Sequence, residues 1–109
     1  MVRPSVGAIW NATKKQTRVQ NAFGHWKKHG AEFPHLHNAK EYVEDAWNFL
    51  LKSPAGTLRK SRANGEIVLF DPATDTFAVY LPNGTPKTMF KPDPSKHGYA
   101  CNLDYFNAQ

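Results

Sequence analysis

The sequence is poor in cysteine: Cys101 is the one cysteine among 109 residues. A disulfide within the chain is therefore excluded, and so is a zinc site built on cysteines. No apolar run approaches the roughly 20 residues that a membrane-spanning helix needs, and the start of the chain lacks the charged-then-apolar pattern of a signal peptide. We therefore expect a domain that is stabilised by side-chain packing and that has no part in a membrane.

Acidic residues are also few, with 9 Asp and Glu against 14 Lys and Arg, which gives a formal net charge of +5. A small basic domain attracts polyanions, so its partner is expected to be nucleic acid or an acidic protein. The 40% of hydrophobic residues, with seven Phe, four Tyr and three Trp, exclude a disordered chain. The length suits one core. We predict a single domain over residues 1–109, in which residues 1–13 are a lead-in segment that docks through Trp10.

Two helices are predicted in the first half. Between residues 14 and 29 apolar side chains recur at helical spacing and predict a buried face that carries Val19, Ala22, Phe23 and Trp26. Gly30 follows where a helix C-cap glycine belongs. The second helix is predicted over 39–52, because Asn38 and Glu41 form an Asn variant of the capping box and Ser53-Pro54 stops the apolar pattern.

Four short strands follow, over 57–62, 66–70, 76–81 and 86–90, with turn residues between them. Asn64-Gly65 is the dipeptide of a two-residue type I′ hairpin. The tail, 91–109, opens with a Pro-rich loop and is expected to pack back through Leu103, Tyr105 and Phe106. Helices grouped before an antiparallel meander predict an α+β fold, with two N-terminal helices packed on a four-stranded sheet.

The first helix carries a polar arc away from Phe23, which at 100° per residue collects Arg18, Asn21, His25, Lys28 and His29. Cleavage of RNA by its own 2′-hydroxyl needs a base, an acid and cations that hold the charged phosphorane. Histidine takes either proton role near neutral pH, and Lys or Arg supplies the charge. A solvated helix face has the same composition, so the arc alone leaves that alternative open.

A metal site is the second interpretation of this helix, since His25 and His29 have the i, i+4 spacing of helical zinc motifs. The HExxH motif has Glu after the first histidine, whereas this run reads His-Trp-Lys-Lys-His. Two lysines beside the ligands would repel a dication, and no carboxylate or cysteine is near to offset them. We therefore expect no metal and no cofactor. His35 and His37, in the loop before the second helix, are interpreted as structural or surface residues.

The sheet is expected to offer a face on which an RNA strand lies. Its polar candidates are Thr57, Arg59, Lys60, Arg62, Thr85, Lys87, Thr88 and Lys91. Tyr80 and Phe90 are aromatic side chains of a kind that stacks on bases, but most aromatic residues of the sheet are expected to lie in the core. Glu66 is a conceivable general base, but a Glu after Asn-Gly is more typical of a hairpin mouth in water.

Two strings carry a resemblance to a known family: GHWKKHGAEFPHLHNAKEYVEDAWNFL, and then GTLRKSRANGEIVLFDPATDTFAVYLPNGTPKTMFKPD. They combine a His-x-x-Lys-His-Gly helix motif, a helix that opens with Asn-Ala-Lys-Glu-Tyr, and a sheet with Arg-x-Asn-Gly, Asp-Pro and Thr-x-Phe. This order, over roughly residues 24–106, resembles C-terminal nuclease domains of polymorphic bacterial toxins, including effector domains of contact-dependent growth-inhibition proteins. The resemblance implies the barnase/EndoU/colicin/RelE-like superfamily.

The resemblance implies metal-independent cleavage of RNA, commonly tRNA, that leaves a 2′,3′-cyclic phosphate. It also implies secretion or cell-surface delivery into the cytoplasm of a target cell, and neutralisation by a cognate immunity protein, apart from which we expect a monomer. Matched by motif, the catalytic residues are His25, Lys28 and His29 on the helix, Arg62 at the hairpin and Thr88 in Thr-x-Phe. The expected RNA-binding residues are Arg18, Arg59, Lys60, Lys87 and Lys91.

Two other functions remain open from the sequence. A non-catalytic RNA-binding module would use the same basic face without needing the histidines. A protein-interaction domain would use its charge for an acidic partner.

Overall fold

The computed structural model describes residues 10–13 and 17–109. Helix α1 (Arg18–His29), the short 3-10 helix η1 (Gly30–Glu32) and helix α2 (Ala39–Leu51) come first. They are followed by strands β1 (Leu58–Ser61), β2 (Ile67–Asp71), β3 (Thr76–Tyr80) and β4 (Pro86–Phe90). Helices α3 (Pro94–His97) and α4 (Asn102–Asn107) complete the order. The strands are antiparallel in the order β1-β2-β3-β4, which confirms the predicted α+β fold.

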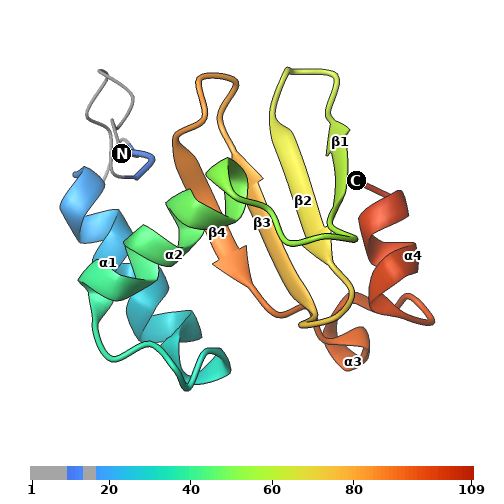
Figure 1. Cartoon of the computed structure of the whole chain (residues 1–109), viewed down its shortest axis with the longest axis horizontal. Helices are drawn as coiled ribbons and strands as arrows, with labels where there is room; N and C mark the ends of the chain where they lie inside the picture. Colours follow the sequence, from blue (N-terminus) through green and yellow to red (C-terminus); the bar gives the residue numbers. More distant parts are fainter. Residues whose placement is uncertain (1–9, 14–16) are drawn as a thin grey trace.

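The sheet has a core on each face, because neighbouring residues of a strand point to opposite sides. On the first face, Leu69, Ala78 and Met89 pack with buried side chains of α2. On the second face, Val68, Phe70, Phe77 and Val79 pack with Phe106 of α4. Figure 1 shows α1 beside β4 at one edge of the sheet and α4 beyond β1 at the other. The second face is therefore flanked by a helix at each edge.

Helix α2 begins as predicted at its Asn38 cap, whose Oδ1 accepts a hydrogen bond from the Glu41 amide at 2.9 Å. The other half of the predicted capping box is displaced by one residue, because the Glu41 carboxylate accepts from the amide of His37 at 2.8 Å. The helix ends at Leu51, one residue earlier than predicted. Tyr42, whose hydroxyl donates to the Met89 carbonyl, ties it to β4.

Helix α1 begins at Arg18, after a Thr17 cap that forms a capping box with Gln20. The predicted start at residue 14 lies outside the described residues. The predicted buried face is wrong in part: Val19 is 65% and Phe23 is 51% exposed, while Ala22 is buried and Trp26 half-buried. The reason is the position of α1 at the sheet edge, where Trp26 contacts Tyr42 of α2 at a ring distance of 5.9 Å.

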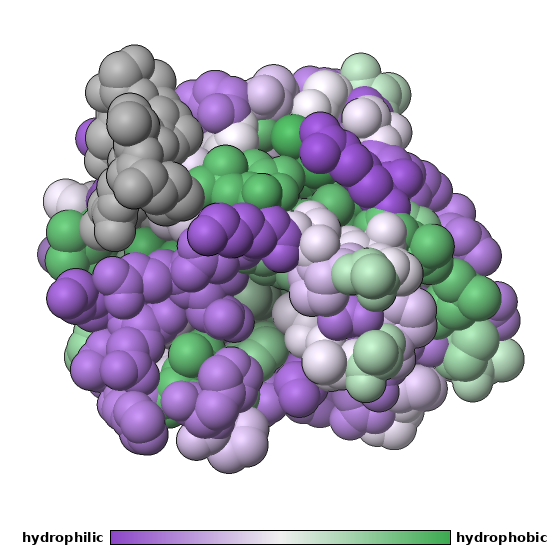
Figure 2. Space-filling view, viewed as in Figure 1, coloured by the Kyte–Doolittle hydropathy of each residue, from purple (hydrophilic) through white to green (hydrophobic). Residues whose placement is uncertain are grey.

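The polar arc of α1 is consequently turned inward: Asn21 is buried, and His25 and His29 are half-buried. Hydrophilic side chains dominate the outer surface over α1 and α2 (Figure 2). Trp10 is fully buried between His25 and Tyr42, at 5.4 Å from each ring, so its predicted docking is confirmed. Residues 1–9 of the lead-in segment lie outside the described residues.

The turn at Asn64-Gly65 is a three-residue loop rather than the predicted type I′ pair. The Arg62 amide donates to the Glu66 carbonyl at 2.8 Å, and the Gly65 amide to the Arg62 carbonyl at 2.9 Å. Gly65 has a φ of 88°, whereas Asn64 does not share the positive φ that a type I′ turn requires of both residues. The Asn64 side chain instead accepts from the Glu66 amide at 3.0 Å. This closure places Arg62 opposite Glu66.

The tail packs back as expected through Phe106, which stacks on Phe70 at 6.0 Å, and through the half-buried Tyr105. Leu103, the third residue of that prediction, is exposed because it lies on the outer side of α4. None of the helices in the described ranges is both long and apolar enough to cross a bilayer.

Candidate active site

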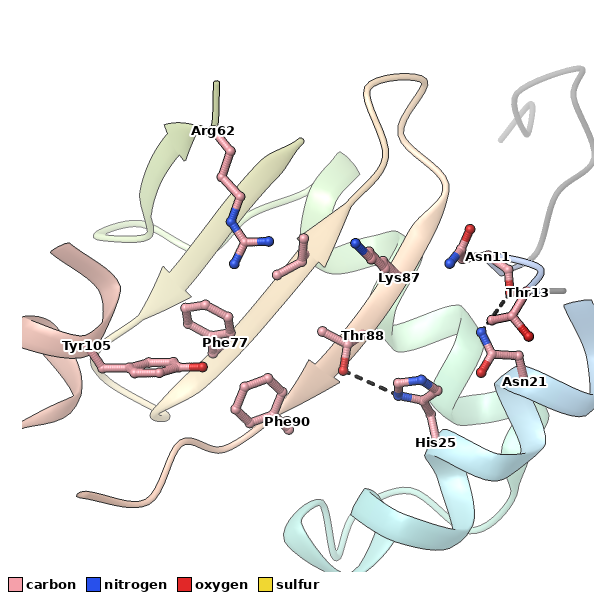
Figure 3. Close-up of a pocket in the computed structure, with 11 residues that line it drawn as sticks. Asn11, Thr13, Asn21, His25, Arg62, Phe77, Lys87, Thr88, Phe90 and Tyr105 are labelled. Carbon is pink, nitrogen blue, oxygen red and sulfur yellow. Dashed lines mark hydrogen bonds between the residues drawn. The ribbon is translucent and has the colours of Figure 1, made fainter. Parts of the chain in front are cut away.

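A cleft of about 310 Å³ lies on the second face of the sheet, between α1 and α4. Its floor carries Phe77, Val79, Thr88 and Phe90 from β3 and β4. Figure 3 shows His25 of α1 on one side and Tyr105 of α4 on the other, with the Tyr105 hydroxyl pointing into the cleft. The cleft therefore joins segments that are far apart in the sequence.

His25 is held on both sides. Its Nδ1 lies 3.3 Å from the Thr88 Oγ1, and its ring lies 5.4 Å from the ring of Trp10. Burial lowers the pKa of His25 below its ordinary value of 6.5, and the nearby charges of His29 and Lys28 lower that pKa further. The imidazole is therefore mostly unprotonated at neutral pH, which is the state that a general base needs.

Two cations are fixed at one end of the cleft by a single carboxylate. Arg62 Nη1 donates to Glu66 Oε1 at 2.9 Å, and Lys87 Nζ donates to Glu66 Oε2 at 2.7 Å. A third contact joins Arg62 Nη2 to the Gln109 Oε1 at 2.7 Å. Arg62 and Lys87 both line the cleft. Their positions are therefore set by three hydrogen bonds to two parts of the chain, Glu66 and Gln109, which suits the binding of a phosphate.

Glu66 itself is 6% exposed, so its interpretation as a solvated residue at a hairpin mouth is wrong. The hydrogen bond from Lys87 is the main cause that lowers the pKa of its carboxyl. The signal that could have found it is its period-two spacing with Val68 and Phe70, which places all three on one face. A carboxylate in line with buried apolar residues needs cationic partners.

His29 belongs to a second cavity of about 410 Å³ that continues from the cleft and shares His25, Thr88, Phe90 and Tyr105 with it. Its Nδ1 lies 2.9 Å from the Glu32 Oε2, and its ring stacks on Phe90 at 5.5 Å. Glu32, which sequence reasoning missed, also accepts from the Lys91 amide at 2.7 Å.

The three helix-motif residues lie along one groove, because Lys28 also lines the second cavity and the rings of His25 and His29 are 6.0 Å apart. Arg62 and Thr88, which the resemblance added to them, line the cleft. All five residues matched by motif are thus brought to one face of the molecule.

The predicted RNA-binding residues are divided between several places. Lys87 lines the cleft and Lys91 the second cavity. Lys60 Nζ donates to the Asn107 carbonyl at 3.0 Å and lies over the Phe106 ring. Arg59 pairs with Leu69 in the sheet register, so it points toward the side covered by α2. Arg18 is exposed in the first turn of α1.

Two expected contributors of the sheet are not available to a ligand. Tyr80 is fully buried, and its hydroxyl donates to the Ala46 carbonyl at 2.6 Å, so it is a core residue, as expected for most aromatic residues of the sheet. Thr85 is buried as well. A period of two identifies which residues share a face, but the choice of the face covered by α2 depends on tertiary packing.

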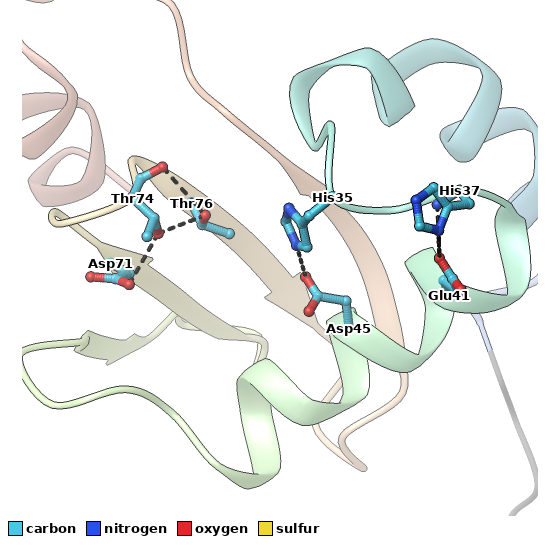
Figure 4. Close-up of polar contacts among 7 residues, drawn as sticks. All are labelled: His35, His37, Glu41, Asp45, Asp71, Thr74 and Thr76. Carbon is cyan, nitrogen blue, oxygen red and sulfur yellow. Dashed lines mark hydrogen bonds and ion pairs between the residues drawn. The ribbon is translucent and has the colours of Figure 1, made fainter.

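His35 and His37 are exposed, as interpreted from the sequence. Figure 4 shows them beside α2, where His37 Nδ1 lies 3.1 Å from the Glu41 carboxylate and His35 Nε2 lies 4.0 Å from that of Asp45. Within residues 10–13 and 17–109, no three His, Cys, Asp or Glu side chains are grouped so that they could hold a metal ion.

No protein-family model matches the chain, and no curated protein matches it in sequence. A solved structure is similar: a ribonuclease from Escherichia coli in complex with its inhibitor protein, with a TM-score of 0.54 and 23% sequence identity. The match covers 76% of this chain and 95% of that one. The chain therefore has the fold of a bacterial ribonuclease.

Proposed function

We propose that the chain is a metal-independent endoribonuclease of the bacterial toxin type. The observation that carries this proposal is the contact of His25 with Thr88 in a cleft that also holds the paired cations Arg62 and Lys87. An unprotonated imidazole in the same cleft as two fixed positive charges suits the transfer of a proton next to a phosphate. The fold shared with a ribonuclease supports the same function.

In the proposed reaction His25 removes the proton of an RNA 2′-hydroxyl, and Thr88 holds the imidazole ring in place. The 2′-oxygen attacks the neighbouring phosphorus, and the bond from phosphorus to the 5′-oxygen breaks. The leaving oxygen takes its proton from the Nε2 of protonated His29, whose Nδ1 is engaged by Glu32. The products are a 2′,3′-cyclic phosphate and a 5′-hydroxyl, so the phosphate keeps its charge and the two histidines exchange proton states.

The cations have a separate role in this mechanism. Negative charge develops on the non-bridging oxygens as the 2′-oxygen attacks, and preorganised donors that face these oxygens stabilise the transition state. Arg62 and Lys87 enter this role already hydrogen-bonded to Glu66, so little side-chain freedom is lost when the phosphate binds. Lys28 supplies a further charge from the side of α1.

The finer parts of the proposal rest on the toxin-like motifs. We infer that the substrate is tRNA, that the domain is secreted or delivered from the cell surface into the cytoplasm of a competing bacterium, and that a cognate immunity protein neutralises it in the producer. The similar ribonuclease was solved with its inhibitor protein, and the net charge of +5 favours an inhibitor of opposite charge.

The test is single-turnover cleavage of total RNA and of purified tRNA in excess EDTA. His25→Gln should lower the cleavage rate by about 10²–10⁴, the usual cost of losing a positioned acid or base. His37→Gln is the matched control, because His37 is an exposed histidine that lines neither the cleft nor the second cavity. The cut ends should carry a 2′,3′-cyclic phosphate, and a substrate with 2′-deoxy sugars should stay intact.

Two results would contradict the proposal. One is a His25→Gln variant that is folded by circular dichroism and cuts RNA at the parent rate. The other is a complete loss of cleavage in EDTA that zinc or magnesium restores. Binding of RNA without any cleavage would instead support the non-catalytic RNA-binding module.

A further inference from the structure

The second cavity extends the groove beyond the proposed cleavage site. It has a volume of about 410 Å³ and is continuous with the cleft through His25, Thr88, Phe90 and Tyr105. The proposed reaction uses only its α1 side, where Lys28 and His29 lie. Its other side is formed by the tail after β4, which includes Lys96, His97 and Tyr105.

This other side is built from stacked aromatic rings. The His97 and Tyr105 rings lie 4.5 Å apart with an angle of 18° between their planes. His97 Nδ1 accepts from the Tyr99 amide at 3.1 Å, so its Nε2 is the nitrogen that donates to Asn102 Oδ1 at 2.9 Å. Both ring nitrogens are therefore used to hold the loop between α3 and α4, and the ring lines the second cavity beside Tyr105.

The rings remain accessible. Tyr105 and His97 are half-buried, and Tyr99, whose ring lies 6.0 Å from that of Tyr105, is 44% exposed. Phe90 continues the aromatic surface toward the cleft, at 6.5 Å from Tyr105. A compact core would bury such a cluster, so its position along a groove indicates a ligand with a flat apolar face.

The charges around this cavity favour an anion. Lys28 and Lys96 line it and are exposed. Its two carboxylates are both engaged: Asp93 Oδ1 accepts from the Ser95 amide and hydroxyl, and Glu32 accepts from Lys91 and contacts His29. The cavity thus combines an aromatic platform with free positive charge, which is the combination that binds single-stranded nucleic acid.

We propose that the second cavity is a nucleotide subsite that takes an unpaired base next to the scissile phosphate, stacked on Tyr105 and His97. This inference rests on the proposed ribonuclease function and names the form of its substrate. The substrate segment is a loop or a single strand, because a base inside an RNA helix has no free face to stack on a protein ring.

The test measures binding rather than cleavage, by fluorescence anisotropy with labelled 2′-O-methyl RNA tetranucleotides. These lack the 2′-hydroxyl nucleophile, and one set carries an abasic unit at each position in turn. An abasic unit at one position should weaken binding to the parent about 5- to 150-fold, the range expected for one stacked base. The other positions should change the affinity much less.

Variants tie that loss to the rings. Tyr105→Leu keeps an apolar side chain beside Phe77 and removes the ring, so the intact and abasic tetranucleotides should bind it equally. If this variant does not fold, His97→Leu gives the same comparison. Lys96→Ala, at an exposed position, should lower the affinity for every oligonucleotide by a similar factor. The slope of the logarithm of the affinity against the logarithm of the salt concentration should fall by about one, the value for one phosphate contact.

The inference is overturned if abasic units have the same effect at every position, if the base dependence persists in both ring variants, if a self-complementary duplex binds as tightly as a single strand, or if nothing binds. The two proposals fail separately. Cleavage with base-independent binding would reject only the subsite, whereas base-dependent binding without cleavage would reject only the ribonuclease.

Discussion

Lys87 of β4 donates a hydrogen bond to the buried Glu66 at 2.7 Å and so ties the last strand of the sheet to the hairpin that joins the first two. The same carboxylate holds Arg62. Glu66 is negatively charged, but it lies between the two cations and holds both of them at this end of the cleft. Its function in the proposed mechanism is to position two cations.

Glu66→Gln should therefore weaken both folding and cleavage. The neutral amide loses charge-assisted hydrogen bonds, each of which contributes about 1.5–3 kcal/mol. Because the amide keeps weaker neutral hydrogen bonds, we expect the free energy of unfolding in urea to fall by about 1–3 kcal/mol. Asp104→Asn, at an exposed carboxylate of α4, is the control. If cleavage instead falls by about 10²–10⁴ with unchanged stability, Glu66 is the proton acceptor and the assignment to His25 is wrong.

The lowered pKa of His25 predicts a pH dependence of cleavage. A general base works only when unprotonated, so kcat/KM should fall on the acid side with an apparent pKa below 6.5. A fall of kcat/KM on the acid side with an apparent pKa above 6.5 would contradict the assignment of His25 as the general base. The measurement is initial cleavage rates from pH 4.5 to 8 at constant ionic strength, with folding checked at each pH.

The same pKa shift predicts a contribution to stability. The folded state binds a proton on His25 at lower pH than the unfolded chain does, so this contribution is present above 6.5 and is lost as the pH falls through the lowered pKa. The free energy of unfolding, measured in urea at several pH values, should change less between pH 6.5 and 5 for His25→Gln than for the parent. An unchanged dependence would mean that His25 titrates as in the unfolded chain.

Lys27 and Lys28 are neighbours that point to different sides, which makes them a matched pair. Lys28 lines the groove, whereas Lys27 lies over the exposed ring of Phe23 at 5.7 Å. Lys28→Ala should lower single-turnover cleavage by about 10²–10³, as the loss of an electrostatic donor does, and Lys28→Arg should keep part of the activity. Lys27→Ala should leave the rate near that of the parent. Equal losses in the two alanine variants would indicate a general effect of net charge.

The proposed immunity protein should associate with this domain at a rate that depends on salt. Charge complementarity accelerates encounter, and dissolved ions screen it over about 10 Å at 0.1 M salt. Stopped-flow association between 0.05 and 0.5 M NaCl should therefore slow markedly, while the dissociation rate changes little. An association rate that does not change with salt would contradict an electrostatic interface. It would not contradict neutralisation, because an inhibitor that binds outside the groove would also neutralise the enzyme.

Helix α2 and the four strands follow from local sequence signals, whereas η1, α3 and α4 were not predicted as helices. The Asn38 cap gave the start of α2, and the turn residues around β4 gave Pro86–Phe90 as observed. Local signals were misleading on α1, where Val19 and Phe23 are exposed and Asn21 is buried. The helix places its polar side inward because that side faces a cleft, so the hydrophobic pattern breaks where the candidate site lies.

The helix part of the candidate site could be predicted because His25, Lys28 and His29 are close in sequence. Glu66 and Tyr105 could not be predicted in this way. The burial of Glu66 depends on Lys87 and Arg62, which approach it only when the sheet is formed. Tyr105 reaches the cleft only because Phe106 fixes α4 against β2. The period of two indicates the face on which Glu66 lies, but no local pattern identifies the distant residues that contact it.

The contact between Arg62 and Gln109 has a consequence for the order of events in a cell. The cleft takes side chains from α1, from the hairpin after β1, from β3 and β4 and from α4, so no fragment that ends before α4 contains all of it. A ribosome that has synthesised the chain only as far as β4 has made His25 and Thr88 but neither Tyr105 nor Gln109. The groove is complete only after α4 has docked, so a chain in which α4 is not yet folded would lack the proposed activity.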